Sequence, residues 1–519
     1  MKSEQKQTNE RGSVARRSVI KLAGATGLVG AVGAGSTSVS ASDDSSPDSF
    51  SVVETTISEI HSAMLHGDLT ATELVEQYLD RIDAYDDDLN AVINVNDNAT
   101  EVAKELDTKY EESGFVGPLH GIPLLLKDNT DTADMPTTGG SVLFEDTTPP
   151  EDAYITKQLR EAGAIIIGKA NLGEFSYGST SSLGGTTKNP YDTDTPAGGS
   201  SAGSGSGTAA NLATISVGTD TGGSIRNPAS NNSLVGVRPT TGLISRSGII
   251  PLSSTLDTAG PMTRTVADTA EMLDVMVGYD PDDPKTAESV GEIPDEGYTS
   301  YLNPNGLDGA RIGVLRQLFS DLDEDDGTLD IIESAISKMD NAGATIIDID
   351  ELPDLVSLAD QGDVISYEID REMEQYLDNL GDAAPVDSLT EIVESDTVEG
   401  VIADITFPEL DDVDSDNLHD DNDYLNALLV KREIRELLFT AMGENDLDAI
   451  VYPYSAANWM SPVAAFPSIN VPAGYTDDGI GQGIEFMAKP FDESTLIELA
   501  YSYEQSSMKR EPPKEFGEL

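Results

Sequence analysis

The chain has 519 residues, of which 30 are basic and 94 acidic, so its formal net charge is −64. It lacks cysteine, which excludes disulfides, thiolate metal sites, a cysteine nucleophile and a lipid-modified cysteine anchor, and its four histidines disfavour a histidine-rich metal site. Such an excess of carboxylates opposes binding to nucleic acid phosphates. Because the acidic residues spread along the whole chain, we interpret them as a surface adapted to molar salt, with attraction to cationic partners as the alternative.

The first 41 residues have the pattern of an export signal. An arginine pair, Arg16 and Arg17, precedes a weakly apolar, glycine- and alanine-rich run over residues 22–35, and small residues at 39–41 offer a cleavage site. This pattern is typical of a twin-arginine signal, which predicts export to the outside or to the cell surface, followed by a flexible linker over residues 42–52. The alternatives are a disordered basic tail, a cytoplasmic chain in which the signal is not used, and a retained anchor, which the modest hydropathy disfavours.

The next segment predicts alternating helices and strands. Residues 53–85 have helical apolar spacing, and Thr70 with Glu73 has the pattern of an N-cap and its capping-box partner. Further helices are predicted at residues 98–113 and 154–162, and strands at 91–94, 121–128 and 164–167, with a turn at 168–171. Helices that alternate with strands in this way are typical of an α/β domain.

The later part of the chain continues this alternation. Residues 280–295, rich in proline and aspartate, and the acidic run at 409–423 are expected to be loops. Strands are predicted at residues 234–238, 249–252, 311–315, 344–349, 448–453, 468–472 and 483–488, and helices at 265–277, 329–342, 426–441 and 494–505.

Residues 195–226 contain two loops of small residues, at 198–204 and 220–226, on either side of a segment at 208–217 suited to a helix and then a short buried strand. Glycine at this density indicates unusual backbone angles or close approach to a ligand, and the serines are potential nucleophiles. Phosphate cradling is disfavoured because no Walker lysine follows, and dinucleotide binding because no acidic ribose partner is in place.

Acyl transfer fits these loops better, since it needs a nucleophile, a base and donors for an oxyanion. Ser224 follows Gly222 and Gly223 in a turn whose backbone amides could converge on one point. No histidine is an obvious base, so Lys127 becomes the best candidate if burial lowers its pKa. From spacing alone, however, a lysine after three leucines is better interpreted as a surface residue that snorkels out of an apolar layer.

These motifs, taken in order, resemble those of the amidase signature family of Ser-cisSer-Lys hydrolases. The segments that carry the resemblance are GIPLLLKDN (121–129), GKANLGEFSYG (168–178), GGSSAGSGSG (198–207), GTDTGGSIRNP (218–228), GVRPTTGLISRSG (236–248), VPAGYTDDG (471–479) and KPFDESTLIELAYSYEQ (489–505). One departure is Ala202, where the family usually has glycine or serine.

The resemblance covers approximately residues 57–277 and 448–505, and it implies an α/β fold with a large mixed, twisted β-sheet covered on both faces by α-helices. It implies one amidase domain over residues 53–519. Within it lie a catalytic core at 57–277, a variable, substrate-shaping region at 284–444 and a closing region at 445–505.

The resemblance also implies the roles of individual residues, and it replaces the surface interpretation of Lys127. Ser224 would be the nucleophile, Ser200 the bridging serine on a cis peptide bond after Gly199, and Lys127 the base. The other implied roles are oxyanion donors in the backbone of Thr221, Gly222, Gly223 and Ser224, contacts near the substrate from Ser176 and Tyr177, and bracing of the loops by Ser201, Asp220 and Arg226. No metal or cofactor is implied.

Three functions remain to be distinguished. The first is an exported amidase that hydrolyses carboxylic or peptide C-terminal amides to an acid and ammonia or an amine. The second is the A component of a glutamyl-tRNA amidotransferase, which the export pattern and the net charge disfavour, and the third is a non-catalytic amide-binding protein, which the complete residue set disfavours. The expected partner is a small amide, without nucleic acid and without stable membrane insertion after signal cleavage; the oligomeric state stays open, with a homodimer as one alternative.

Overall fold

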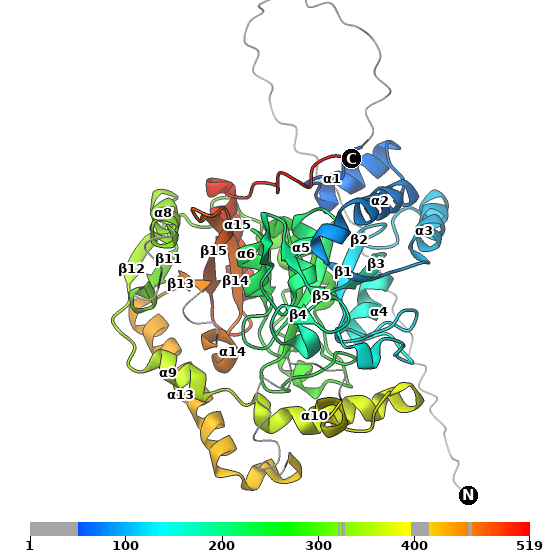
Figure 1. Cartoon of the computed structure of the whole chain (residues 1–519). Helices are drawn as coiled ribbons and strands as arrows, with labels where there is room; N and C mark the ends of the chain where they lie inside the picture. The colour runs from blue at the N-terminus through cyan, green and yellow to red at the C-terminus, as the bar shows by residue number, and fades with distance from the viewer. Residues whose placement is uncertain (1–49, 320–321, 323–326, 396–414, 455–458) are drawn as a thin grey trace, which may run out of the picture. The chain divides into compact units, whose positions relative to one another are not determined.

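Eleven strands form one sheet in the computed structural model, which describes residues 50–519 except 320–321, 323–326, 396–414 and 455–458 (Figure 1). The predicted signal and all but the last residues of the predicted linker lie outside the described part. From edge to edge the strands are β1 (Val92–Val95), β3 (Ile165–Ala170), β2 (Pro123–Lys127), β8 (Ile215–Asp220), β10 (Thr258–Thr263), β9 (Val235–Arg238), β14 (Ser468–Tyr475), β15 (Gly481–Met487), β13 (Ala449–Pro453), β11 (Arg311–Val314) and β12 (Thr345–Asp348).

Parallel and antiparallel pairs both occur in this sheet. β2 runs parallel to β3 and β8, and β11 runs parallel to β12 and β13, whereas the other neighbours pair antiparallel. The predicted mixed sheet is therefore confirmed. Two small sheets lie apart from it, one made of β4 (Thr180–Ser181) and β5 (Gly185–Thr186), the other of β6 (Lys188–Asn189) and β7 (Asp192–Pro196).

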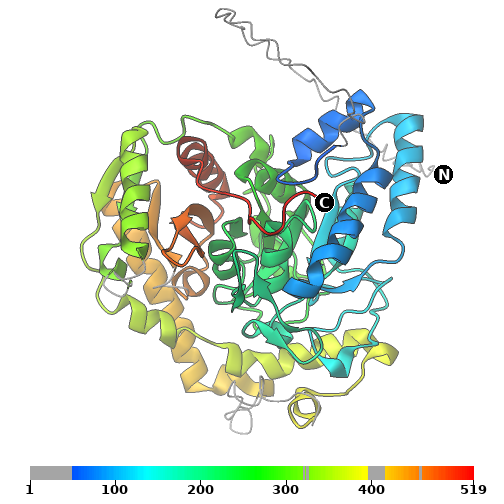
Figure 2. The same ribbon diagram turned by 45° about the horizontal axis from the view of Figure 1, so that its top comes forward.

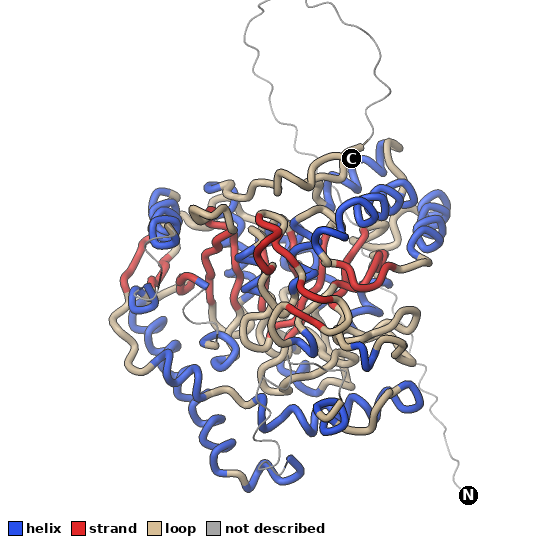
Figure 3. Tube along the Cα trace, in the orientation of Figure 1, coloured by secondary structure: helices blue, strands red, loops and turns tan. Residues whose placement is uncertain are grey.

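Helices flank the sheet, as the tube of Figure 3 shows by colour. α2 and α3 lie at the end that carries β1 to β3, α8 lies beside β11 and β12 at the other end, and α10 and α13 lie along the lower margin of Figure 1; Figure 2 shows the same arrangement from a second direction. The α-helices are α1 (Ile57–His66), α2 (Ala71–Leu89), α3 (Ala99–Ser113), α4 (Tyr154–Glu161), α5 (Ala202–Ala209), α6 (Arg226–Asn231), α7 (Val266–Met276), α8 (Thr328–Asn341), α9 (Leu355–Gln361), α10 (Ile365–Leu380), α11 (Leu389–Val393), α13 (Asn422–Asn445), α14 (Met460–Ala464) and α15 (Glu493–Ser507).

Local sequence accounts for several of these elements. The Thr70 hydroxyl caps α2 by accepting from the Glu73 amide, and the Glu73 carboxylate accepts from the Thr70 amide, so the predicted capping box is confirmed. Within the described residues, none of the helices has the length and apolar character that crossing a membrane requires.

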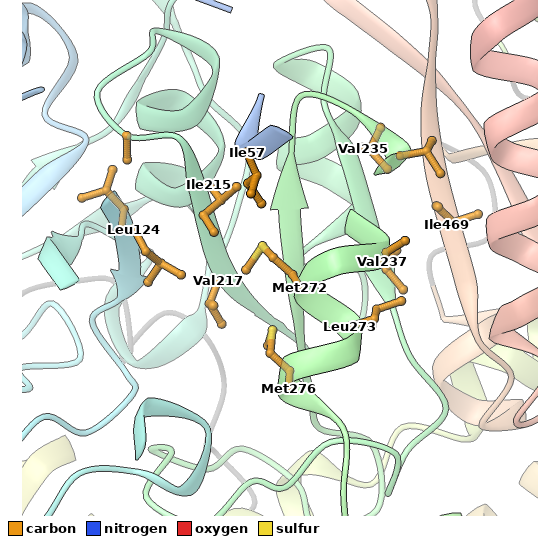
Figure 4. Packing of buried hydrophobic residues seen from close by; sticks show 14 of the residues in the cluster. Ile57, Leu124, Ile215, Val217, Val235, Val237, Met272, Leu273, Met276 and Ile469 are labelled. Atoms are coloured by element: carbon orange, nitrogen blue, oxygen red, sulfur yellow. The ribbon is translucent and has the colours of Figure 1, made fainter. Parts of the chain in front are cut away.

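The core lies between the helices and the sheet. One face of α7 packs directly onto the middle strands (Figure 4). Each large apolar side chain buried on this face contributes about 1.5–3 kcal/mol relative to full exposure. The contact joins Met272, Leu273 and Met276 of α7 with Ile215 and Val217 of β8 and Val235 and Val237 of β9.

Two predictions around the glycine-rich stretch were wrong. β3 continues through residues 168–170, where a turn was predicted, because parallel pairing with β2 satisfies its backbone. The helix of the stretch is α5, which begins at Ala202 inside the predicted loop, not after residue 208. A Cβ on Gly203 would come within 2.2 Å of the Ala91 oxygen, and one on Gly207 within 2.6 Å of Leu125, so small residues here allow a fully buried helix to approach the sheet.

Other differences concern segments without a clear local pattern. Residues 249–252 make only an isolated bridge, Ile249 with Thr130, and β10 was not predicted. A short 3₁₀ helix, Pro284–Ser289, lies within the loop expected at 280–295, and α13 begins at Asn422, inside the acidic run.

Candidate active site

Lys127 is the last residue of β2, a strand in which all five residues are buried. Its side chain is 0% exposed, so the interpretation as a snorkelling surface lysine is wrong. The Lys127 Nζ lies 2.8 Å from Ser200 Oγ and 2.7 Å from Thr219 Oγ1. The amine is therefore held by hydroxyl groups inside the protein.

Burial determines the protonation of Lys127. Removal from water lowers its pKa from 10.5 to about 7, although the carboxylates of Asp220 and Asp257 act in the opposite direction. An amine with this pKa is neutral in a large fraction of molecules near neutral pH, and a neutral amine has the lone pair that a general base needs.

Ser200 follows a cis peptide bond, Gly199–Ser200, as predicted. Its side chain is 1% exposed, and its carbonyl accepts from the Gly173 amide at 3.0 Å. The Gly199 amide donates to Asn227 Oδ1 at 2.9 Å, and a Cβ on Gly199 would come within 1.8 Å of the Gly178 oxygen. The backbone of this loop is thus enclosed by its neighbours, with no room for a side chain at residue 199.

Ser224 lies between the end of β8 and the start of α6, and it is partly exposed, unlike Lys127 and Ser200. The Ser201 amide donates to the Ser224 carbonyl at 3.1 Å, which joins the two predicted loops. The Ser224 hydroxyl makes no hydrogen bond with a described residue, so the contact between Ser200 and Ser224 stays a prediction. Accessibility therefore increases from the lysine to the predicted nucleophile.

Asp220 holds the loop that carries Ser224. Its buried carboxylate accepts from the amides of Gly223 at 2.9 Å and Ile225 at 3.1 Å, and from Arg226 Nε at 3.1 Å and Arg238 at 2.9 Å. Burial alone would raise the pKa of Asp220, but the two guanidinium groups hold it well below its usual range. Arg226 also pairs with Glu485 at 2.9 Å, so this cluster of buried charges, made of Asp220, Arg226, Arg238 and Glu485, connects the Ser224 loop to β15.

The predicted oxyanion donors are not equivalent. The Gly223 amide is bonded to Asp220, which reduces the predicted set to Thr221, Gly222 and Ser224. The amides of Gly222 and Ser224 have no acceptor among the described residues and remain open to a ligand. Thr221 is anchored through its side chain, since its Oγ1 donates to Asp257 Oδ1 at 2.6 Å.

A cavity of about 690 Å³ lies beside these residues. Of the other residues to which the resemblance gave a role, one lines this cavity and two do not. Ser176 lines this cavity and accepts a bond from Asn129 Nδ2 at 3.1 Å. Tyr177 is not part of the lining and packs against the core cluster around α10 and α13. Ser201 lies behind the site, where its Oγ donates to the Thr219 carbonyl at 3.1 Å.

Sequence reasoning missed three residues that connect these groups. Thr219 bonds to Lys127, Asn129 bridges Thr219 at 3.0 Å and Ser176, and Asp257 holds Thr221. Asn129 and Thr219 lie inside motifs that carried the resemblance, so that signal was available for them. Asp257 belongs to no such motif.

A second buried lysine supports the Lys127 strand from its neighbour. Lys169 of β3 pairs with Asp128 at 3.1 Å, and both side chains are 0% exposed. Lys169 also donates to Thr137 Oγ1 at 2.9 Å, and the Thr138 amide donates to Asp128 at 3.2 Å. This pair fixes the chain directly after Lys127.

Comparisons with known proteins agree with this geometry. The model of the family described as Amidase matches residues 73–465. A probable amidase from Arabidopsis thaliana is 35% identical over 90% of this chain and 92% of its own length, and the A component of the glutamyl-tRNA(Gln) amidotransferase from Carboxydothermus hydrogenoformans is 33% identical over 86% and 96%. Among solved structures, the native peptide amidase from Stenotrophomonas maltophilia has 36% identity and a TM-score of 0.79, covering 89% of this chain and 98% of that one.

The family model covers most of the chain, and the relatives align over nearly their full length. The buried lysine, the cis Gly199–Ser200 bond and the glycine-rich turns occupy the positions that the resemblance implied. The protein is a hydrolase that acts on amides, and the chain belongs to the amidase signature family.

Proposed function

We propose that the protein hydrolyses carboxylic or C-terminal peptide amides through an acyl-enzyme on Ser224, with Ser200 and Lys127 as a proton relay. The observation that carries the proposal is the 2.8 Å contact between the buried Lys127 amine and Ser200. The similarity to a peptide amidase supports amides of short peptides as the substrate class.

In the first step, neutral Lys127 takes the proton of Ser200 while Ser200 takes the proton of Ser224. The Ser224 oxygen then attacks the amide carbonyl and forms a tetrahedral intermediate. The open amides of Gly222 and Ser224 are the donors for its oxyanion, and a lost donor of this kind lowers kcat by about 10²–10³.

In the second step, the relay returns the proton from Lys127 through Ser200 to the leaving nitrogen. The carbon–nitrogen bond breaks, and ammonia or an amine departs. Water then attacks the acyl-enzyme with its proton taken by the same relay, which releases the acid and restores Ser224.

Ammonia release from an amide panel tests this proposal. Wild type should release ammonia from simple and peptide amides, and a fluorophosphonate probe should label Ser224. Ser224→Ala should remove both signals, whereas Ser179→Ala, which alters a partly exposed serine directly after the segment at 168–178, should retain them. Unchanged turnover in Ser224→Ala contradicts the assignment.

The A component of a glutamyl-tRNA amidotransferase remains the alternative, because relatives of that name align along the chain. The two functions differ in their need for partners. Hydrolysis of free amides by the isolated chain supports the amidase, whereas activity that appears only with co-purified partner proteins and glutamyl-tRNA supports the alternative.

We also propose that the protein is exported and adapted to high salt. The twin-arginine pattern and the net charge of −64 support this. Since the Debye length grows from about 3 Å at 1 M salt to about 10 Å at 0.1 M, dilution should increase self-repulsion and unfold the protein. Stability that is unchanged between molar and 0.1 M KCl contradicts the adaptation, and replacement of Arg16 and Arg17 by lysine should abolish export.

A further inference from the structure

The cavity beside the catalytic residues continues past them toward α10. Its lining includes Asn129, Ser176 and Thr219, which form a hydrogen-bonded chain to Lys127, and it also includes Asp131 and Tyr376. Tyr376 belongs to α10, within the region that the sequence identified as substrate-shaping. A ligand in this cavity therefore contacts both Thr219, which is bonded to Lys127, and the residues of α10.

Asp131 is held firmly in the cavity wall. Its amide donates to the Gly248 carbonyl at 2.8 Å, and its own carbonyl accepts from the Ala153 amide at 3.0 Å. The side chain is only 6% exposed, and its Oδ1 accepts from the Tyr376 hydroxyl at 2.8 Å. Its other oxygen, Oδ2, accepts no hydrogen bond from a described residue. A buried carboxylate with an unused acceptor facing a cavity is prepared for an external donor.

No described cation of the wall neutralises Asp131. The two basic residues in the described lining are already paired, Lys157 with Glu151 at 2.8 Å and Arg246 with Asp283 at 2.6 Å. Lys169, which faces Asp131 from β3, is bonded to Asp128. The acidic residues of the lining are Asp131, Glu151, Asp152, Asp257, Asp280, Asp282, Asp283 and Glu372.

The distance from the catalytic lysine sets the size of the ligand. Asp131 follows Lys127 by four residues, and a fully extended chain of that length spans at most about 14 Å. A molecule that contacts both the catalytic groups and Asp131 therefore needs a length of at most about four residues. This fits short peptide amides.

We propose that Asp131 binds the ammonium group of the substrate, so that the enzyme prefers short amides with a free amine or a basic side chain. This inference rests on the proposed amidase function. An ammonium donates to the unused Oδ2, and it supplies the positive charge that the wall lacks. Burial raises the pKa of Asp131 to about 7, against the opposing effects of Tyr376 and Lys169, while the neighbouring Asp128 and Asp152 carboxylates raise it further.

Two substrates that differ only in the amine test this proposal: L-alanyl-L-phenylalaninamide and its N-acetyl derivative. Wild type should have a kcat/KM about 10- to 100-fold higher for the free amine, as expected for a charge-assisted hydrogen bond. Asp131→Asn should bring this ratio close to one, with hydrolysis of the acetylated amide largely retained. Asp282→Asn, which removes an exposed carboxylate from the same wall, is the matched control and should keep the wild-type ratio.

A pH series on wild type provides a second readout that does not depend on folding of a variant. The ratio of the two kcat/KM values cancels the titration of Lys127, and it should fall as the pH drops below 7 because Asp131 is then protonated. Equal rates for the two substrates in wild type, an unchanged ratio in Asp131→Asn, or a flat ratio across pH 5.5 to 7.5 each overturn the proposal. Failure of wild type to hydrolyse either amide instead contradicts the proposed function.

Discussion

The amine of Lys127 lies 2.8 Å from the hydroxyl of Ser200, although 73 positions separate the two residues in the chain. Lys127 ends β2, which lies between β3 and β8, whereas Ser200 precedes α5, and the packing of α5 against β2 and β8 brings the two together. The contact places a base of lowered pKa beside the only serine of the predicted triad that is fully enclosed.

Removal of the amine should nearly abolish catalysis. Lys127→Ala is expected to lower kcat/KM by about 10²–10⁴, the usual contribution of a general base. The control is Lys104→Ala, which removes an exposed lysine of α3 that pairs with Glu101 at 3.7 Å. Hydrolysis rates on the acetylated amide measure both variants, and a fall of less than tenfold in Lys127→Ala contradicts its role.

The pH profile should follow Lys127. The amine acts only when neutral, and its pKa is lowered to about 7, so kcat/KM should rise about tenfold per pH unit below 7 and level off above it. The uncharged acetylated amide is the appropriate substrate, because it avoids titration of the substrate amine. A limb centred near pH 10 would show that the lysine keeps its ordinary pKa.

The Asp220 cluster should matter for stability as well as rate. Asp220→Asn leaves Arg226 and Arg238 without their shared carboxylate, and loss of one partner from a buried ion pair lowers the free energy of unfolding by about 3–5 kcal/mol. Glu436→Gln is the matched control on the surface, where solvent screens its pair with Arg432. Urea titration at fixed salt measures both, and equal effects would refute the structural role of the cluster.

Gly199 should tolerate no side chain. In Gly199→Ala the new Cβ would meet the Gly178 oxygen at 1.8 Å, so the loop that carries Ser200 must move and activity should fall at least about 100-fold. Gly443→Ala is the contrasting variant, because a Cβ there has no atom within 4 Å and the position lies in α13. It should raise the free energy of unfolding by about 0.5–1 kcal/mol, as alanine does in a helix interior. Wild-type kinetics in Gly199→Ala would contradict the expected clash.

Local patterns predicted much of the fold. The capping box at Thr70 and the apolar strand that ends at Lys127 each depend on residues that are close together in the sequence, so they could be predicted without tertiary information. β10 and α10 were not predicted, because their stability comes from partners distant in sequence. β10 pairs with β8, and α10 packs in the core cluster around α10 and α13. Short-range periodicity does not record such partners.

For the site, the sequence by itself determined which residue types carry the chemistry, because each of the motifs around Lys127, Ser200 and Ser224 is one uninterrupted segment of the chain. Whether Lys127 is buried, and hence neutral enough to act as a base, was decided only by the tertiary structure, since desolvation depends on the strands and loops packed around it. The tertiary structure alone also decided that Asp257 contacts Thr221 and that Asp131 lies in the cavity wall. Their partners, Thr221 and Tyr376, lie 36 and 245 positions away, a separation that only folding closes.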